Sequence, residues 1–303
     1  MTKPKSPQRW AYDLTIILNT LGGDDRFPVN VRELAQEFSR QRFPDDPISL
    51  VQGRALPGFE GALVKAPPGE KGWGIFYNSD TASTGRINFT LAHEFGHYLL
   101  HRQDHPDGIQ CSTEDMERWD SKYRQIEKEA NEFAANLLMP LDDFRRQIAP
   151  KARPDLETLG VCADSYGVSL IAATLRWLQY TERRAVLVKS IDGFIHWAWS
   201  SDRALRTGAY FKTSGRPPIE IPPSSIPAKD ADLVRRKATR EHGAGIWFKE
   251  PCVEHALVSE VHDFALSLIL LDDAPSRFEV GEKTEEDTYD RMISRTPGSS
   301  WLG

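Results

Sequence analysis

The spacing of hydrophobic residues predicts helices over most of the first 180 residues. Ala11, Leu14 and Leu18 recur at intervals of three and four and would share one face of a helix. Glycines at 22 and 23 end that helix, and Pro140 ends a later one. The helices predicted in this way span residues 10–21, 31–38, 87–101, 114–139, 141–148, 156–166 and 169–180.

The period changes to two in several shorter stretches, which indicates strands. Residues 59–65 and 73–77 form one predicted pair, and residues 185–190 and 194–199 form a hairpin around Asp192 and Gly193. Residues 214–229 are rich in Pro and Ser and are predicted to form a loop. Residues 247–248 and 266–271 look strand-like, and the pattern of residues 254–263 is ambiguous. The last twenty residues are polar and are expected to be loosely ordered.

This pattern predicts an α+β protein with two parts. Residues 1–184 would form a mainly helical domain with a small sheet, and residues 185–303 a smaller accessory α+β region. The sequence leaves open whether the second part senses a small molecule, binds a partner in a regulatory role or only covers the core.

Composition narrows the class of protein. The 303 residues are 40% hydrophobic and 27% charged, which is ordinary for a globular chain. The formal net charge is −6 and no long Lys/Arg run occurs, so a broad nucleic-acid-binding face is not expected. One short basic patch is expected to be a solvated helix face; it consists of Arg235, Arg236, Lys237 and Arg240.

The cysteines and the apolar stretches indicate the cellular compartment in which the protein is expected. Cys111, Cys162 and Cys252 are odd in number and widely spaced, which speaks against a disulfide framework and for a reducing compartment. Residues 1–9 are polar with no apolar run behind them, and the longest apolar stretch, 264–271, is too short to span a bilayer. We therefore expect a soluble cytoplasmic protein.

The clearest chemical signal is H-E-x-x-H at His93, Glu94 and His97, inside an apolar predicted helix. Residues four apart project from nearly one helix face, so the two imidazoles can bind a single metal ion. Glu94 is turned by about 100° and can take the proton of a water activated at the metal. Three fixed positions arise by chance only on the order of 1% of the time in a chain of this length.

A hydrolytic zinc site needs a third protein ligand and an open position. Glu127 is the favoured candidate, because Asn131 lies one turn further along the same face and could hydrogen-bond a ligating histidine. Glu129 is the second candidate, although its direction indicates a solvated side chain. No fourth ligand with suitable spacing is evident.

Four other histidines are weaker candidates for the third ligand. His101 and His105 continue the spacing of four, but each step advances about 6 Å along the helix, too far for one tetrahedral ion. We expect both to be surface or capping residues near the helix C-terminus. His196 and His255 carry no spacing signal.

Two blocks of sequence resemble the ImmA/IrrE family of metallopeptidases. They read R-I-N-F-T-L-A-H-E-F-G-H-Y-L-L-H at residues 86–101 and E-K-E-A-N-E-F-A-A-N-L-L-M-P at residues 127–140. The resemblance extends over about residues 30–180. It implies a thermolysin-like, zincin fold with one zinc ion held by His93, His97 and Glu127 and with Glu94 as catalytic base. Asn131 stands where this wider pattern often has an aspartate, which would orient the histidine more strongly.

The resemblance also implies a role, namely a zinc-dependent endopeptidase that cleaves a helix-turn-helix repressor and so releases stress-response or mobile-element genes. Manganese or iron could replace zinc in such a site. Two alternatives remain. One is a zinc-containing regulatory protein that binds a partner without cleaving it. The other is a DNA-binding regulator that uses residues 156–180 as a helix-turn-helix, although we expect that segment to pack against the peptidase core.

Overall fold

The computed structural model describes residues 5–56, 58–80, 83–110, 121–213, 217–229, 237–259 and 264–276. These residues form two compact units. The first contains the described residues up to Asp143 together with Ala163–Ala172, and the second contains Phe144–Cys162 and the described residues from Ala173 onward. The predicted α+β class with a small sheet and a second sheet near the C-terminus is confirmed. The predicted boundary at residue 184 stays a prediction.

The first unit is built from four strands and from helices that cover them. Its elements are α1 (Pro7–Gly22), the short 3-10 helix Gly23–Arg26, α2 (Val31–Arg42), β1 (Ile48–Arg54), β2 (Gly61–Lys65), β3 (Trp73–Asn78), α3 (Thr84–Leu100), β4 (Gly108–Gln110), α4 (Ser121–Leu138) and the start of α5 (Leu141–Gln147). The strand order is β1-β3-β2-β4, with β1 parallel to β3 and the other pairs antiparallel.

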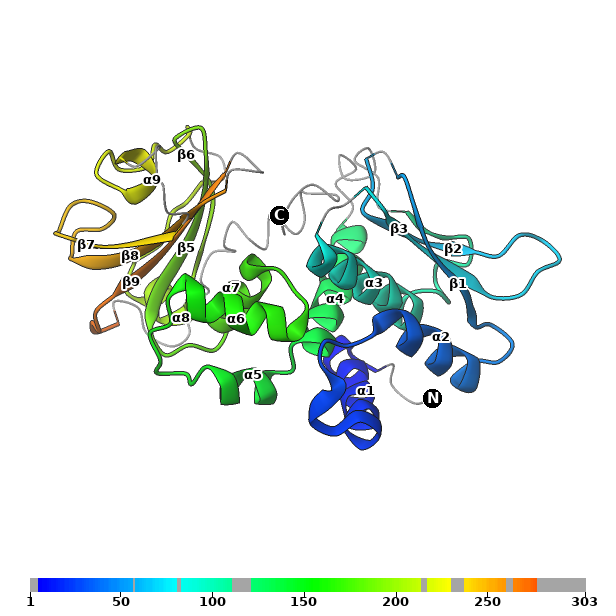
Figure 1. Ribbon diagram of the computed structural model, residues 1–303. Helices are drawn as coiled ribbons and strands as arrows, with labels where there is room; N and C mark the ends of the chain where they lie inside the picture. Colours follow the sequence, from blue (N-terminus) through cyan, green and yellow to red (C-terminus); the bar gives the residue numbers. More distant parts are fainter. Residues whose placement is uncertain are drawn as a thin grey trace. The chain divides into compact units, whose positions relative to one another are not determined.

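The helices of this unit lie in successive layers on the sheet. Helix α3 contacts β2 and β3, α2 contacts β1 and α3, and α4 contacts both α3 and α1 (Figure 1). The apolar face of α3 fills the space between the sheet and α4, since Phe95 and Tyr98 are fully buried. Helix α4 presents Phe133 and Leu137, also fully buried, to the same core. Buried apolar area of this kind is the main stabilising term of the unit.

Local signals set the ends of the helices. The hydroxyl of Ser83 caps α3 by accepting a hydrogen bond from Arg86 N, and Asn30 caps α2 in the same way through Glu33 N. The hydroxyl of Ser169 accepts a hydrogen bond from Ala172 N and caps the start of α7 (Leu170–Leu178). The predicted helix 114–139 is confirmed from residue 121 to residue 138, and its residues 114–120 lie outside the described residues.

The second unit is organised around a five-stranded antiparallel sheet of order β6-β5-β9-β8-β7. Asp192 and Gly193 have positive φ angles, 51° and 79°, and form the predicted hairpin turn. Strand β9 is buried along its whole length. The elements are α6 (Leu156–Tyr166) and α7 (Leu170–Leu178), both shared with the first unit, then β5 (Arg184–Ile191), β6 (Phe194–Ser200), α8 (Asp202–Arg206), α9 (Ile226–Lys229), β7 (Lys237–His242), β8 (Cys252–Val258) and β9 (Ala265–Leu271).

Three local predictions for this region need correction or completion. Residues 247–248 do not form a strand; Trp247 lies in the turn region after Gly245 and inserts its side chain into the core. Lys237 and Arg240 lie on strand β7 rather than on a helix face, and Arg235 and Arg236 lie outside the described residues. The ambiguous segment after residue 250 contains strand β8. The polar last twenty residues also lie outside the described residues.

The helix-turn-helix alternative receives no support from the packing of α6 and α7. Every residue of α7 from Ile171 to Leu178 is buried, and Arg176 is only 3% exposed. A recognition helix must present side chains to a groove of DNA, and α7 has no face free to do so.

No single helix in the described part of the chain is long and apolar enough to cross a membrane. Helices α6 and α7 meet that criterion only when they are taken together, and the chain bends by 106° between them. Cys162 and Cys252 are buried, Cys162 Sγ donates to Gln147 Oε1, and Cys111 lies outside the described residues.

Candidate metal centre

The three residues of the H-E-x-x-H motif lie on α3 on the side that faces the interior of the first unit. His97 is fully buried, Glu94 is 2% exposed, and the side chain of His93 is 12% exposed. The Nε2 atoms of His93 and His97 are 2.9 Å apart, so both imidazoles point at the same place. This is the geometry expected for an i, i+4 pair on one helix face.

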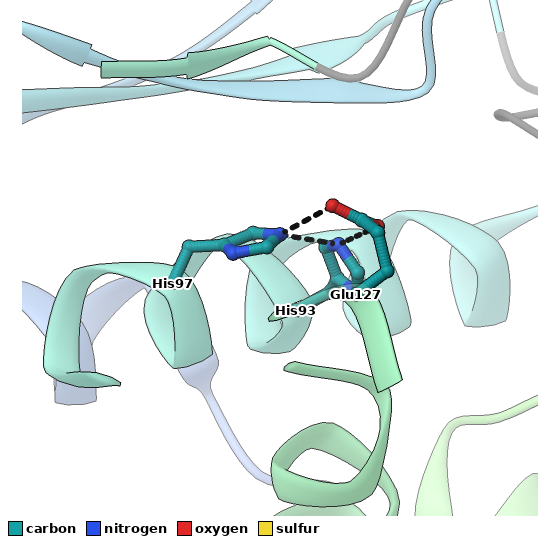
Figure 2. Close-up of side chains that lie close together, drawn as sticks. All are labelled: His93, His97 and Glu127. Atoms are coloured by element: carbon teal, nitrogen blue, oxygen red, sulfur yellow. Dashed lines mark hydrogen bonds and ion pairs between the residues drawn. The ribbon is translucent and has the colours of Figure 1, made fainter. Parts of the chain in front are cut away.

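Glu127 reaches this place from α4. Its Oε2 lies 3.3 Å from His93 Nε2, and its Oε1 lies 3.2 Å from His97 Nε2. Figure 2 shows the three side chains pointing toward one another from the two helices. One ligand atom from each residue lies within 4.8 Å of the others, close enough to share one metal ion. The described part of the chain contains no second group of this kind.

A glycine inside the motif allows α3 and α4 to approach this closely. A Cβ on Gly96 would lie 2.9 Å from the Phe133 ring and 3.3 Å from both Cα and the carbonyl oxygen of Ala130. Ala130 contributes little bulk from the other helix. The pairing of small residues at this crossing therefore places Glu127 opposite the two histidines.

Each histidine is also held at its other ring nitrogen. His93 Nδ1 donates to Asn131 Oδ1 over 3.0 Å, which is the partner predicted from the spacing of Glu127 and Asn131. His97 Nδ1 lies 3.1 Å from His101 Nδ1, and His101 Nε2 lies 3.1 Å from Glu129 Oε2. Partners of this kind fix the orientation and the tautomer of a ligating imidazole.

These contacts refine two predictions. His101 is the C-cap residue of α3, as expected, but it is not a surface residue, because it is only 5% exposed and bonds His97. Glu129 is not a freely solvated side chain, since it bonds His101 and also accepts from Gln125 Nε2. Neither residue belongs to the group of possible metal ligands.

The other histidines considered as ligands, His105, His196 and His255, are not part of the group of possible metal ligands among the described residues. His105 is partly buried with a buried Nε2 that has no hydrogen-bond partner among the described residues. His196 and His255 belong to β6 and β8 of the second unit, and His255 bonds Thr239. This agrees with the absence of a spacing signal for either residue in the sequence.

Glu94 is buried next to the cluster without a hydrogen-bond partner for its Oε2 among the described residues. Its side chain lies against the start of β2, where a Cβ on Gly61 would come within 2.8 Å of Glu94 Oε1 and 2.6 Å of Thr90 Cγ2. A buried and unsatisfied carboxylate oxygen is costly, and such atoms are rare outside functional sites. Glu94 is therefore placed to act on something that enters the site.

The two histidines of the motif differ in the direction in which their surroundings shift the pKa. Burial alone would lower the pKa of His93, but the hydrogen bond and charge of Glu127 outweigh it and raise the pKa to about 9. Burial lowers the pKa of His97 to about 4, although Glu127 opposes the shift. The pKa values of the two histidines are therefore shifted in opposite directions.

The two acidic groups differ in the same way. Burial raises the pKa of Glu94 to about 8, while the charge of His93 works against the shift. Burial alone would also raise the pKa of Glu127, but His97 and His93 outweigh it and hold that pKa well below its ordinary range. Glu127 is therefore the ionised carboxylate of the cluster. Strongly shifted groups gathered in one place are typical of a functional site.

The donor set fits a divalent cation such as zinc. Two imidazole nitrogens and one carboxylate are ligands that zinc accepts, and three protein ligands leave a position open for water or substrate. Glu94, the neighbour of His93 in the sequence, is buried with an Oε2 that has no partner among the described residues, and could act as a general base. The set is also compatible with manganese or iron.

An H-E-x-x-H helix, a glutamate from a second helix and a neighbouring small sheet together define a site of the metallopeptidase type. Comparison with known families agrees. Residues 50–178 match the family model of peptidase family M78, described as the IrrE N-terminal-like domain. This match confirms the family resemblance predicted from the sequence. A search of curated proteins found no significant match.

The matched range begins in β1 and ends with the last residue of α7. It contains His93, Glu94, His97 and Glu127, together with the Asn131, His101 and Glu129 partners. Residues 30–49, which the predicted resemblance included, lie outside the match.

Proposed function

We propose that this chain is a zinc-dependent endopeptidase that cleaves a helix-turn-helix repressor and so releases stress-response or mobile-element genes. The observation that carries the proposal is the convergence of His93, His97 and Glu127 beside the buried, unpartnered oxygen of Glu94. The match to the M78 family supports a peptidase and hence a protein substrate. The choice of a repressor as substrate rests on the family resemblance alone.

In this proposal His93, His97 and Glu127 hold the metal ion, and their positions are fixed by Asn131 and His101. When bound, zinc supplies the Lewis acidity that activates water and polarises the scissile carbonyl. The negative charge of Glu127 partly balances the cation within a buried site. The carboxyl of Glu94 ionises more readily next to a cation, because opposite charge lowers the pKa of a carboxyl group.

Glu94 moves the proton. Its Oε2 accepts a proton from the attacking water while that water adds to the peptide carbonyl, and the same atom returns the proton to the leaving nitrogen. Since Oε2 has no partner among the described residues, it need not break a hydrogen bond before it accepts the proton. Gly61 at the start of β2 packs closely against this carboxyl group, since an added Cβ would come within 2.8 Å of Glu94 Oε1.

A regulatory protein that binds a partner without cleaving it is the main alternative. A structural zinc site normally closes with four protein ligands. Here the group in the described residues has three, and Glu94 lies beside it as an unpartnered base. These features favour hydrolysis.

The test compares wild type with Glu94→Gln, which keeps the shape of the side chain and removes its basicity. Bound metal is quantified in both proteins, and each is incubated with the helix-turn-helix repressor encoded nearest to the gene. One zinc per chain in both proteins, with cleavage by wild type only, supports the proposal. Zinc without cleavage supports the regulatory alternative. No metal in either protein would overturn both.

A further inference from the structure

A chain of hydrogen bonds runs from His97 away from the metal cluster. His97 Nδ1 lies 3.1 Å from His101 Nδ1, and the two ring centroids are 5.2 Å apart. His101 Nε2 lies 3.1 Å from Glu129 Oε2. Gln125 Nε2 then donates to the other oxygen of Glu129 over 2.6 Å. The first two members are at most 5% exposed, so water does not replace these bonds easily.

Only one arrangement of protons satisfies this chain when His97 offers Nε2 to a cation. His97 must then carry its proton on Nδ1 and donate it to His101. His101 accepts at Nδ1 and must carry its own proton on Nε2, which it donates to Glu129. A carboxylate accepts only, so Glu129 sets the direction of the whole chain.

The two histidines of the motif are thus held by different means. His93 donates to the amide oxygen of Asn131, a neutral acceptor. His97 donates to an imidazole that is itself polarised by a carboxylate. An acceptor backed by negative charge makes the donor imidazole a better electron donor at its other nitrogen.

We propose that His101 and Glu129 are positioning residues that hold His97 in the tautomer and orientation needed to bind the metal ion, and that they strengthen its bond to that ion. This inference rests on the proposed function, since it requires the cluster to bind metal. Neither residue touches the substrate or the reacting atoms.

A purely structural role for His101 would predict something different. Its backbone N–H donates to the carbonyl oxygen of His97 at the end of α3, and a substituted residue keeps that bond. If His101 served only to cap the helix and to fill space in the core, its replacement would change folding stability and would not change the affinity of His97 for the metal ion. The test must therefore measure the metal bond itself.

The experiment uses the full chain and measures the zinc dissociation constant by competition with a chromophoric chelator. His101→Ala removes the acceptor, and we expect zinc binding to weaken about 10- to 100-fold. His101→Asn restores an oxygen acceptor near the same position and should recover part of the loss. Glu129→Gln keeps the size of the side chain but removes its charge, and should give a smaller loss.

Two controls separate positioning from stability. Glu132→Gln alters a carboxylate on the same helix that bonds Gln8 instead of the histidine chain, so its zinc affinity should equal that of wild type. The visible absorption of the Co²⁺-substituted protein reports ligand geometry directly. It should change in His101→Ala and stay unchanged in Glu132→Gln. If His101→Ala fails to fold, Glu129→Gln decides, because that side chain is 31% exposed and tolerates the change.

The outcomes for the two proposals are distinct. Wild type that binds zinc, with unchanged affinity in both His101→Ala and Glu129→Gln, overturns this inference and leaves the proposed function standing. Wild type that binds no metal overturns both. Weaker binding in both variants with partial recovery in His101→Asn supports the inference.

Discussion

Gly96 on α3 lies against the backbone of Ala130 on α4, where an added Cβ would come within 3.3 Å of two Ala130 backbone atoms. This contact sets the distance between the helix that carries the two histidines and the helix that carries Glu127. The geometry of the metal cluster is therefore set by the absence of a side chain.

Gly96→Ala tests that relationship. Alanine favours a helix interior by about 1 kcal/mol over glycine, but overpacking of a core contact costs about 1–3 kcal/mol. We expect a net loss of stability and weaker zinc binding, because neither the Ala130 backbone nor the fully buried Phe133 ring can move aside freely. Urea unfolding and a chelator competition measure the two effects. Gly160→Ala is the matched control on α6, where the nearest atom to the new Cβ is 3.9 Å away, and it should bind zinc normally.

Gly61→Ala should damage catalysis while the metal stays bound. The new Cβ would come within 2.8 Å of Glu94 Oε1 and 2.6 Å of Thr90 Cγ2, so the carboxylate must shift from the position it now holds. We expect cleavage to fall by at least about tenfold, a part of the roughly 10²- to 10⁴-fold that a general base contributes, with zinc content unchanged. Gly243→Ala has no atom within 4 Å of the new Cβ and serves as the control. Full activity in Gly61→Ala would show that the packing of Gly61 against Glu94 does not position that carboxylate.

Zinc uptake should release protons in a pH-dependent way. The pKa of His93 is raised to about 9 by Glu127 against the effect of burial, so at pH 7 this ligand carries a proton that must leave before it binds a cation. His97, whose pKa burial lowers to about 4, is already neutral. We expect at least about one proton released per zinc at pH 7, fewer as the pH rises through about 9, and an affinity that increases over the same range. Calorimetry in buffers of different ionisation enthalpy measures this release, and equal heats in all buffers at pH 7 would contradict it.

Asn131→Asp should tighten zinc binding several-fold. A carboxylate accepts more strongly than an amide from His93 Nδ1, which now donates to Asn131 Oδ1 over 3.0 Å. Asn131→Ala removes the acceptor and should weaken binding about 10-fold or more. Chelator competition measures both variants in parallel. Affinities that do not follow the order Asp, Asn, Ala would argue against an orienting role for residue 131.

Asp46 should stabilise the first unit at neutral pH but not in strong acid. Its carboxylate accepts hydrogen bonds from Lys65 Nζ, Trp73 Nε1 and Arg102 Nε. Burial alone would raise its pKa, but these partners outweigh burial and lower the pKa below 3.8. A lowered pKa means that the stabilisation is present above pH 3.8 and is lost as the pH falls through the folded-state value.

Asp46→Asn should therefore cost about 1 kcal/mol at pH 7, the size expected when partly exposed ionic hydrogen bonds are exchanged for neutral ones. The difference from wild type should shrink as the pH is lowered below about 3.8. Denaturant unfolding at a series of pH values measures it. The neighbouring Asp45→Asn is the control, because that side chain is 96% exposed. An Asp46→Asn penalty that grows in acid would contradict the assignment.

Much of the metal cluster could be predicted from sequence because its parts are local. His93, Glu94 and His97 share one helix, and the helical period alone places both imidazoles on one face. Glu127 and Asn131 likewise share a face of one helix. The pairing of His101 with His97 and Glu129 could not be predicted in the same way, because it depends on how α3 packs against α4. Its one local signal is the spacing of four between His97 and His101, which by itself does not distinguish a hydrogen-bond partner from a further ligand.

Three features of the fold that the sequence pattern does not predict also depend on tertiary packing. Strand β7 is charged and forms the edge of its sheet, so its sequence resembles a polar helix face. Strand β1 shows no regular alternation of buried and exposed residues that would reveal a period of two. Trp247 is an aromatic residue buried without strand pairing, because the turn after Gly245 carries its side chain into the core. In each case tertiary packing overrides the local pattern.

The chain passes between the two compact units more than once. Residues 144–162 belong to the second unit, 163–172 return to the first, and the chain from Ala173 belongs to the second again. No single cut of the chain therefore separates one unit from the other. A peptidase fragment truncated at residue 184 would keep Arg153, Glu157 and Arg183 but lose Asp272, Lys237 and Asp273, the residues with which they form ion pairs. Such a fragment would lack the partners of these three side chains, so biochemical work on the metal cluster needs the whole chain.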